Sequence, residues 1–334
     1  MNGYKTETLK IKSSADGLEL SVLFVMPEPA NAQVGVQSVN GKKDDNDGQH
    51  GVKKCRGIVQ IVHGMSEYKE RYLPLMMFLA EHGLASVIHD HRGHGESVRD
   101  VRDYGYMYEA GTDAFLEDIR QVNGIARQKL PGLPLVMFGH SMGSLAARSL
   151  MRKYDREVDV LILSGAPCRN SAVDAAIFLA ALQKRLYGGR HVANLLEKMS
   201  FLPYVKRFAH EKNKFAWICS DPWVVEAYDR DPRCGFTFTV DGFQTLFELM
   251  KRTYTLKGWK CSNPQLPILF LAGEEDPCIG STAKFRKEIR YMERAGYIDV
   301  QGLQYKGMRH EICNEPDKKK VFEDVEGFLR RRDI

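Results

Sequence analysis

The sequence predicts an α/β fold with a mostly parallel central sheet and helices on both faces. From residue 57 onward, short apolar segments of strand length alternate with longer segments of helical periodicity. Such alternation is typical of parallel sheets covered by helices. The chain has 334 residues, of which 43% are hydrophobic and 27% charged. These values suit one large domain that carries an insertion.

The first 54 residues are expected to form a hairpin and a loop. The segments TETLKIKSS and LELSVLFVM have the composition of strands, and Ala15, Asp16 and Gly17 join them as turn residues. Residues 27–54 are rich in Gly, Asn, Asp, Gln and Lys, so they bury too little apolar surface to become ordered. We therefore expect an antiparallel hairpin followed by a mobile surface insertion.

Alternating strands and helices follow this insertion. Strands are expected at GIVQIVHG, LASVIHD, LPLVMFG, VDVLILSG, LPILFLAG and IDVQGLQY. Helices are expected at YLPLMMFLAEHG, GTDAFLEDIRQVNGIARQKL and MGSLAARSLMRKY, and a last helix is expected after residue 316.

The alternation is interrupted between "SGAP", which ends at Pro167, and the strand near Leu266. We interpret this region as a helical cap and divide the chain into core residues 1–166, cap residues 167–256 and core residues 257–334. A cap at the carboxyl edge of the sheet controls substrate entry. Its apolar residues line an acyl tunnel, touch a lipid surface or simply pack the cap onto the core. They are Ile177, Phe178, Leu182, Leu186, Leu195, Leu196, Phe201 and Leu202, and we assign the first four to the substrate pocket.

A serine at a strand-to-helix junction is the first candidate for chemistry. Gly139, His140, Ser141, Met142 and Gly143 form a G-x-S-x-G pattern. This turn brings neighbouring backbones close and strains the serine, so it needs small residues on both sides. The alternative is a glycine-rich turn whose serine only caps a helix. The strand before the motif and the helix after it favour a nucleophile at Ser141.

A serine hydroxyl attacks efficiently only when a base removes its proton and a carboxylate orients that base. In this architecture the acid and then the histidine follow the serine along the chain. Asp276 lies after a predicted strand and His310 lies before the last helix. Glu274 and Glu275 are competing acids, but the Asp-Pro pair after the penultimate strand favours Asp276.

The oxyanion of an acyl-transfer reaction needs N–H donors, one of which belongs to the residue after the nucleophile. That residue is Met142. The second donor is expected in the loop after the first central strand, where His63 and Gly64 shape the turn and Met65 offers its N–H. The alternative is an ordinary helix-entry loop, because no side chain takes part.

Five segments, HGMSEYKERY, DHRGHGES, GHSMGS, GEEDP and GMRHEI, resemble the monoacylglycerol lipase and lysophospholipase group of α/β-hydrolases, also grouped with serine aminopeptidase (S33-type) proteins. The resemblance covers nearly the whole chain and implies an α/β-hydrolase fold with an inserted helical cap. It also implies a triad and two oxyanion donors, in agreement with the assignments made from the residues alone. These are Ser141, Asp276 and His310 for the triad and Met65 and Met142 for the oxyanion.

Two departures from this family matter. Tyr68 stands where many members have histidine, and the insertion at residues 27–54 is unusually long. Neither touches the chemistry directly, although Tyr68 is placed to alter the pocket rim.

Three histidines, His89, His91 and His94, raise the question of a metal site. Their spacing imitates the H-x-H-x-D-H zinc motif, but Gly93 stands where that motif has aspartate. No acidic or cysteine ligand with zinc spacing accompanies them. The family resemblance implies that this loop turns the chain beneath the cleft. We therefore expect a structural role, no metal and no cofactor.

Charge, the N-terminal segment and the cysteine content indicate which partners and which cellular compartment to expect. The net charge of +5 lies in short patches without a nucleic-acid recognition motif, so we expect no nucleic-acid partner. The N-terminus lacks the apolar core of a signal peptide, and the seven cysteines show no C-x-x-C pair. We expect a cytoplasmic protein without a disulfide framework. Cys278 and Cys313 flank the acid and the base; packing or oxidation sensitivity is open for both.

The sequence thus predicts a serine hydrolase that cleaves carboxylic esters through an acyl-enzyme. The resemblance implies a monoacylglycerol or lysophospholipid substrate and allows transient contact with a lipid surface. A short-chain carboxylesterase or thioesterase is the alternative within hydrolases, and a ligand receptor on the same fold is the alternative outside them. The sequence leaves the oligomeric state open.

Overall fold

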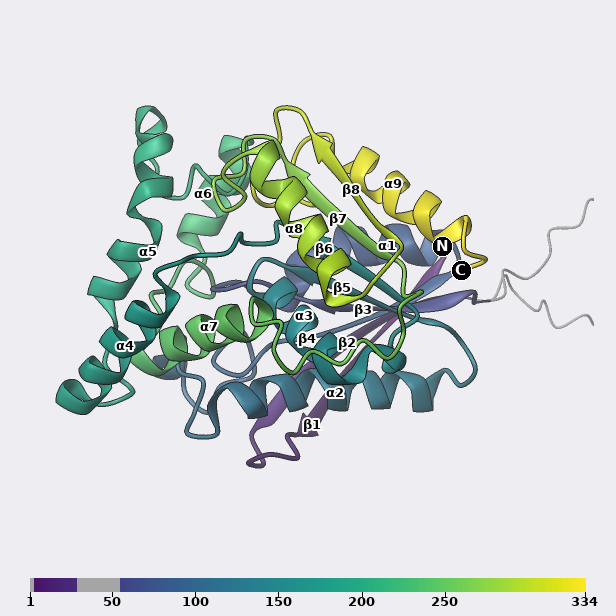
Figure 1. Cartoon of the computed structure of the whole chain (residues 1–334). Coiled ribbons are helices and arrows are strands. Elements are labelled where there is room, and N and C mark those ends of the chain that lie inside the picture. The colour runs from purple at the N-terminus through teal and green to yellow at the C-terminus, as the bar shows by residue number, and fades with distance from the viewer. Residues whose placement is uncertain (1–2, 29–54) are drawn as a thin grey trace, which may run out of the picture.

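The computed structural model describes residues 3–28 and 55–334, so the predicted insertion, apart from residues 27 and 28, lies outside the described residues. An eight-stranded sheet in the order β1-β2-β4-β3-β5-β6-β7-β8 forms its centre (Figure 1). The strands are β1 (Tyr4–Lys12), β2 (Glu19–Pro27), β3 (Gly57–Val62), β4 (Leu84–His89), β5 (Leu135–His140), β6 (Val160–Ser164), β7 (Ile268–Gly273) and β8 (Val300–Tyr305).

The predicted hairpin and the mostly parallel sheet are confirmed. β1 pairs antiparallel with β2 over their full lengths, and β2 pairs antiparallel with β4. The other six strands, β3 to β8, are mutually parallel. β3, β5, β6 and β7 are buried at every residue, which explains why they lack the alternation of half-exposed strands.

Two apolar cores, one on each face of the sheet, hold the helices. Alternate residues of β3 divide between them: Val59 and Ile61 pack with α1 and α9, whereas Ile58 and Val62 pack with α2, α3 and α8. The helices are α1 (Leu73–Glu81), α2 (Gly111–Lys129), α3 (Met142–Tyr154), α4 (Val173–Tyr187), α5 (Asn194–Arg207), α6 (Pro222–Arg230), α7 (Val240–Thr253), α8 (Thr282–Ala295) and α9 (Lys318–Arg330).

Helices α4 to α7 lie between β6 and β7 along the chain. In Figure 1, α4, α5 and α6 extend beyond one end of the sheet. α7 is tied to α3, because Thr253 Oγ1 donates to the Leu145 carbonyl at 3.0 Å and Ser149 Oγ to the Leu249 carbonyl at 3.4 Å. The division into core and cap stays a prediction, and α7 is the helix through which this segment joins the core.

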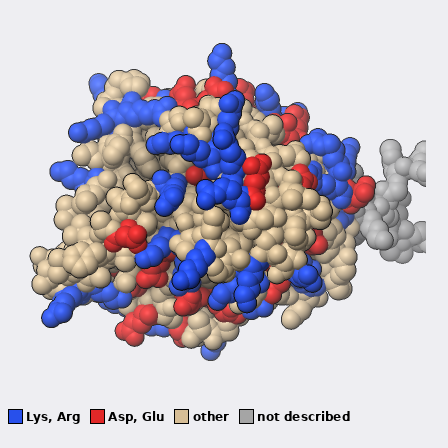
Figure 2. Space-filling model, viewed as in Figure 1, with Lys and Arg blue, Asp and Glu red and all other residues tan. Residues whose placement is uncertain are grey.

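The surface carries separate basic areas. On the face in Figure 2, Lys and Arg gather over α8, where Lys284, Arg286, Lys287 and Arg290 are exposed. Among the described helices, none combines the length and apolar content needed to cross a bilayer.

Candidate active site

Ser141 occupies a strained turn between β5 and α3. Its backbone has φ 50° and ψ −118°, a conformation that a non-glycine residue rarely adopts. A Cβ on Gly139 would lie 2.7 Å from the Gly143 carbonyl oxygen, and a Cβ on Gly143 would overlap the Val62 carbonyl oxygen. The close approach of β3, β5 and α3 therefore requires both glycines of the G-x-S-x-G pattern.

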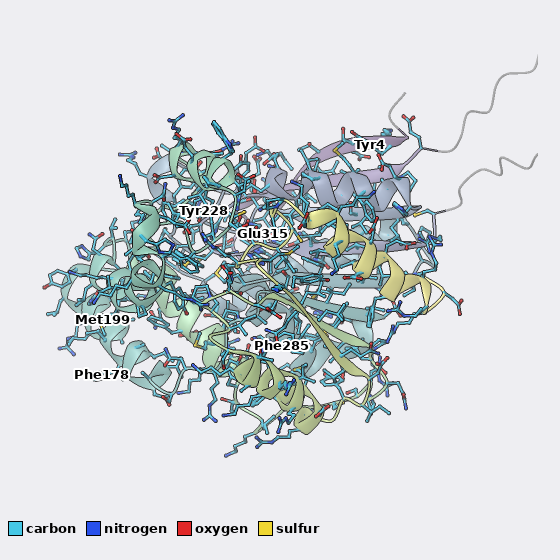
Figure 3. The ribbon with its side chains drawn as sticks, turned by 90° about the horizontal axis from the view of Figure 1, so that it is seen from above. Tyr4, Phe178, Met199, Tyr228, Phe285 and Glu315 are labelled. Atoms are coloured by element: carbon cyan, nitrogen blue, oxygen red, sulfur yellow. The ribbon has the colours of Figure 1, made fainter. Side chains whose placement is uncertain are left out.

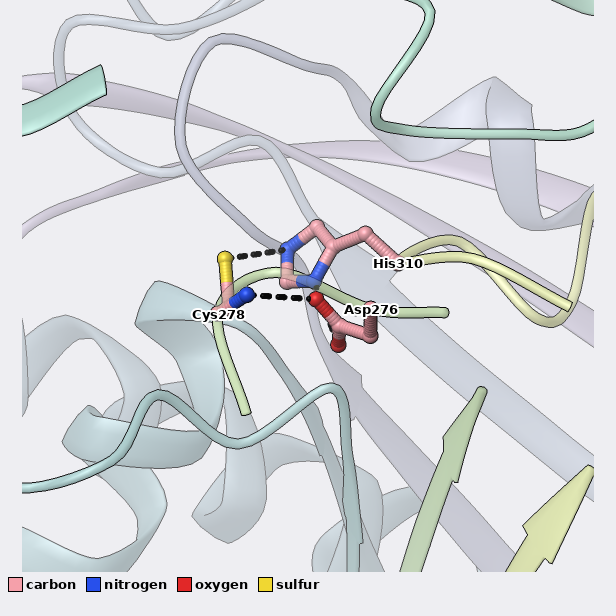
Figure 4. Close-up of side chains that lie close together, drawn as sticks. All are labelled: Asp276, Cys278 and His310. Atoms are coloured by element: carbon pink, nitrogen blue, oxygen red, sulfur yellow. Dashed lines mark hydrogen bonds and ion pairs between the residues drawn. The ribbon is translucent and has the colours of Figure 1, made fainter. Parts of the chain in front are cut away.

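His310 and Asp276 lie beside Ser141. His310 Nε2 is 2.9 Å from Ser141 Oγ, and His310 Nδ1 is 2.9 Å from Asp276 Oδ2. The loops after β7 and β8 carry Asp276 and His310, and the backbone N–H of Cys278 donates to Asp276 Oδ1 at 2.8 Å (Figure 4). The structure thus brings together the serine, histidine and aspartate that the sequence singled out.

The competing carboxylates lie elsewhere. Glu274 is exposed, and Glu275 Oε2 lies 3.8 Å from Arg309 Nε. Asp276 is the buried acid of the three, with 1% exposure, and the only one of them in contact with His310.

Two histidines of the site have opposite charge preferences. Burial disfavours the charged form of His310, but Asp276 and Cys278 together outweigh burial and raise the pKa of His310 well above its ordinary value. His140, whose ring centroid is 4.8 Å from that of His310, has a pKa lowered to about 3, by burial first and then by the charge of His310. His310 can therefore hold a proton taken from a hydroxyl, while His140 stays neutral.

The two predicted oxyanion donors flank Ser141. Met65 follows β3, Met142 is the first residue of α3, and both line the cavity at Ser141. Within the described part of the chain, neither backbone N–H has a hydrogen-bond partner. The neighbouring N–H of Gly64 donates to Glu67 Oε1 at 2.5 Å. The free donors are thus set beside a loop that is held in place.

A buried ion network, which the sequence analysis missed, supports this loop. Arg71 donates to Glu67 Oε2 at 2.9 Å and to both oxygens of Glu311, the residue after His310. Glu67 Oε1 also accepts from Tyr72 Oη at 2.9 Å, and burial raises the pKa of Glu67 to about 7. Tyr228 of α6 donates to the Ser66 carbonyl at 2.9 Å. The i,i+4 spacing of Glu67 and Arg71 was the available signal.

The histidine-rich loop lies beneath this site. The His91 N–H donates to His63 Nε2 at 2.9 Å, and the two rings stack with centroids 3.9 Å apart. His94 Nε2 accepts from the Ser66 N–H at 3.2 Å, and burial lowers the pKa of His94 to about 4. Burial likewise lowers the pKa of His89 to about 3. These imidazoles are neutral and bond to the backbone and to each other.

A cavity of about 550 Å³ opens at Ser141 and His310. Its wall is mostly apolar and comes largely from α4, α5 and α7. α4 and the residue before it contribute Ala172, Ala175, Ala176 and Leu179, α5 contributes Leu196, Glu197, Met199, Ser200, Phe201, Pro203, Tyr204 and Val205, and α7 contributes Leu246, Phe247 and Met250.

The pocket residues assigned from the sequence need correction. Ile177, Phe178, Leu182 and Leu186 are not among the residues that line the cavity. Phe178 and Leu186 are 72% and 62% exposed, whereas Ile177 packs on the core. Figure 3 shows Phe178 and Met199 at the end of the molecule far from Tyr4. Because α4 is apolar around much of its circumference, periodicity did not distinguish its inner face from its outer face.

The cavity also holds a carboxyl group that the sequence analysis did not single out. Glu197 lines the wall, and its Oε2 is buried without a hydrogen-bond partner among the described residues. Burial raises the pKa of Glu197 to about 7, and the nearby Lys214 opposes this shift.

The other apolar residues of the predicted cap divide into two groups. Leu196 and Phe201 line the cavity, whereas Leu195 and Leu202 do not.

Tyr68 faces the segment between α6 and α7. Its hydroxyl donates to Asp231 Oδ2 at 2.8 Å and accepts from Arg233 at 2.9 Å. Burial first, and then Asp231, raise the pKa of Tyr68 to about 12. Tyr68 therefore links the loop after β3 to the α6–α7 connection.

Comparisons with known proteins identify the family of this chain. A family model described as serine aminopeptidase, S33 (Hydrolase_4) matches residues 53–317. The chain is 29% identical to a monoacylglycerol lipase of Mycolicibacterium smegmatis over 292 residues, which cover 82% of this chain and 88% of that protein. It is 28% identical to a monoglyceride lipase of Saccharomyces cerevisiae over 302 residues, covering 84% and 87%.

A solved structure extends the comparison. The structure resembles that of a thermostable carboxyl esterase from Bacillus coagulans in complex with glycerol, with a TM-score of 0.84 and 25% identity over 98% of this chain and 99% of that one. This likeness and the mostly parallel sheet confirm the α/β-hydrolase fold.

Proposed function

Because the chain belongs to the serine aminopeptidase, S33 family and is a carboxylic ester hydrolase of the monoacylglycerol lipase-like group, we propose that it cleaves monoacylglycerols or lysophospholipids through an acyl-enzyme on Ser141. The distance that supports this proposal most directly is the 2.9 Å between Ser141 Oγ and His310 Nε2.

In the proposed mechanism, Ser141 Oγ attacks the ester carbonyl while His310 Nε2 takes its proton. Asp276 holds the opposite ring nitrogen and stabilises the imidazolium. The backbone N–H groups of Met65 and Met142 stabilise the tetrahedral oxyanion. His310 then protonates the departing alcohol, and water releases the acyl group by the same steps.

The cavity supports a substrate with one long acyl chain. Its volume of about 550 Å³ and its mostly apolar wall suit an aliphatic chain. The names of the two lipase relatives point to the same substrate class.

A lipid surface is the proposed source of this substrate. Phe178, Leu186 and Met199 are 72%, 62% and 60% exposed. Lys184, Arg185 and Lys198 are exposed on the same two helices, α4 and α5. Exposed apolar side chains beside basic ones favour shallow contact with an anionic lipid interface.

Hydrolysis of p-nitrophenyl esters of increasing acyl length tests the proposal, with Ser141→Ala as the matched control. We expect a maximum at medium or long chains in the wild type and no activity in the variant. A maximum at acetate would instead indicate a short-chain carboxylesterase. Saturable ligand binding without turnover in either protein would indicate a receptor.

A further inference from the structure

We propose that the thiol of Cys278 and the Nε2 atom of His310 form a binding site for a thiophilic divalent cation such as Zn²⁺ or Cd²⁺, and that the bound cation inhibits hydrolysis. The inhibition rests on the proposed function, because His310 is the general base of the proposed hydrolysis. The binding of the cation does not depend on that function.

The two donor atoms lie at nearly the required separation. They belong to a cluster of three metal-ligating side chains, Asp276, Cys278 and His310, in which Asp276 bonds the other ring nitrogen of His310. Cys278 Sγ is 4.0 Å from His310 Nε2 (Figure 4). Tetrahedral zinc holds sulfur at about 2.3 Å and nitrogen at about 2.0 Å, which places these two ligands about 3.5 Å apart. A small rotation of the Cys278 side chain therefore completes the pair.

The partner of His310 suits a metal ligand as well as a base. Asp276 Oδ2 lies 2.9 Å from His310 Nδ1, which directs Nε2 toward Cys278. Histidines that bind zinc commonly donate their other ring N–H to a carboxylate in this way. Ser141 Oγ, 2.9 Å from Nε2, gives up this hydrogen bond when the cation binds, and water from the cavity completes the coordination.

A metal ion can reach these atoms through the cavity. Cys278, His310 and Ser141 all line it. When the metal–sulfur bond forms, the thiol proton leaves to solvent, and His310 binds through an unprotonated Nε2. The bound cation then occupies the nitrogen that would accept the Ser141 proton.

The histidine-rich loop is a poorer candidate for the same cation. His63 Nε2 accepts the His91 N–H, and His94 Nε2 accepts the Ser66 N–H. Across residues 3–28 and 55–334, the group at Asp276, Cys278 and His310 is where three metal-ligating side chains converge.

Cadmium binding tests the site without relying on catalysis. Cd²⁺ is titrated into the Ser141→Ala protein, and the ultraviolet charge-transfer band of a cadmium–thiolate bond is recorded. We expect a saturable band in Ser141→Ala. The band should be lost when Cys278→Ala or Cys278→Ser is added, and the serine variant nearly preserves the size of the side chain. Ser141→Ala/Cys55→Ser is the matched control, since Cys55 is more exposed and does not line the cavity. It should keep the band.

Inhibition is then measured in proteins that retain Ser141. Zn²⁺ should inhibit the wild type, EDTA should reverse the effect, and Mg²⁺, which prefers oxygen ligands, should have none. Each protein's rate is expressed relative to its own rate without zinc. The zinc concentration that halves this rate should be about tenfold higher or more in Cys278→Ser than in the wild type.

Two results would overturn the inference: a cadmium band that survives loss of Cys278, or equal zinc sensitivity in Cys278→Ser and wild type. If the wild type hydrolyses no ester, the proposed function fails, yet the cadmium titration still decides whether the site exists.

Discussion

The carboxyl edge of the sheet and the helices α4 and α5 meet at one cavity, but they differ in how their polar groups are satisfied. At the sheet edge, Ser141, His310 and Asp276 are hydrogen-bonded in series. On α5, Glu197 Oε2 is buried and has no hydrogen-bond partner in the described part of the chain, and on α4, Phe178 is 72% exposed. A preorganised site tolerates little change, whereas a wall with unsatisfied groups adapts to what it binds. We therefore expect the edge to govern the reaction and the helices to govern which substrate reaches it.

Asp276→Asn should produce the largest loss. Without the carboxylate, His310 loses its orientation and the charge that stabilises its imidazolium, so kcat should fall about 10⁴-fold. Asp276 also raises the pKa of His310. Hydrolysis needs the neutral imidazole, so the wild-type rate should fall as pH drops through that raised pKa, above the ordinary histidine value of 6.5. In the variant this acid limb should move to lower pH.

A pH–rate profile of kcat/KM on a soluble ester provides the measurement, with Glu274→Gln as the matched control. Glu274 is exposed and lies two residues earlier. Equal losses in both variants would contradict the assignment of Asp276.

Gly143→Ala tests how tightly the sheet edge is packed. The added Cβ would overlap the Val62 carbonyl oxygen, so we expect a loss of about 3 kcal/mol in the free energy of unfolding or a failure to fold. Gly124→Ala, within α2 and with nothing within 4 Å of the added Cβ, should gain about 0.5–1 kcal/mol. Urea denaturation measures both, and equal stabilities would refute the steric explanation of the motif.

Glu197→Gln should have a smaller effect of opposite sign. The pKa of Glu197 is raised from 4.5 to about 7 by burial, so this carboxyl group makes the folded state progressively less stable as pH rises from 4.5 to about 7. The substitution should raise the free energy of unfolding by about 1–2 kcal/mol at pH 8 and leave it unchanged near pH 4.5. Urea denaturation at the two pH values measures this. Glu293→Gln, at an exposed position of α8, is the matched control, and equal changes in the two variants would contradict the role assigned to burial of Glu197.

Phe178→Ser should change stability least, by under about 0.5 kcal/mol, because this side chain is mostly in solvent. Its effect should appear in the ratio of two rates. Hydrolysis of monoacylglycerol in anionic vesicles should fall severalfold relative to hydrolysis of a dissolved ester. An unchanged ratio would remove Phe178 from the proposed lipid contact.

The same contrast explains what the sequence could predict. The G-x-S-x-G turn is a local motif whose glycines follow from backbone contacts, and the chain order of the fold located Asp276 and His310. The wall of the cavity depends instead on which side of α4 faces inward. Phe178, Leu182 and Leu186 form an apolar stripe that the structure leaves exposed. The burial of Glu197 Oε2 depends on the packing around α5 and has no signal in the sequence.

The central claim, nucleophilic attack by Ser141, is tested most directly by covalent labelling. A fluorophosphonate is reacted with the wild type, Ser141→Ala and Ser144→Ala, and peptide mass spectrometry locates the adduct. Ser144 is the matched control, because it lies in the same turn and donates to the Ser141 carbonyl at 2.6 Å. We predict one adduct per chain on Ser141, retained in Ser144→Ala and absent in Ser141→Ala. An adduct on another residue, or ester hydrolysis that persists in Ser141→Ala, would contradict the account.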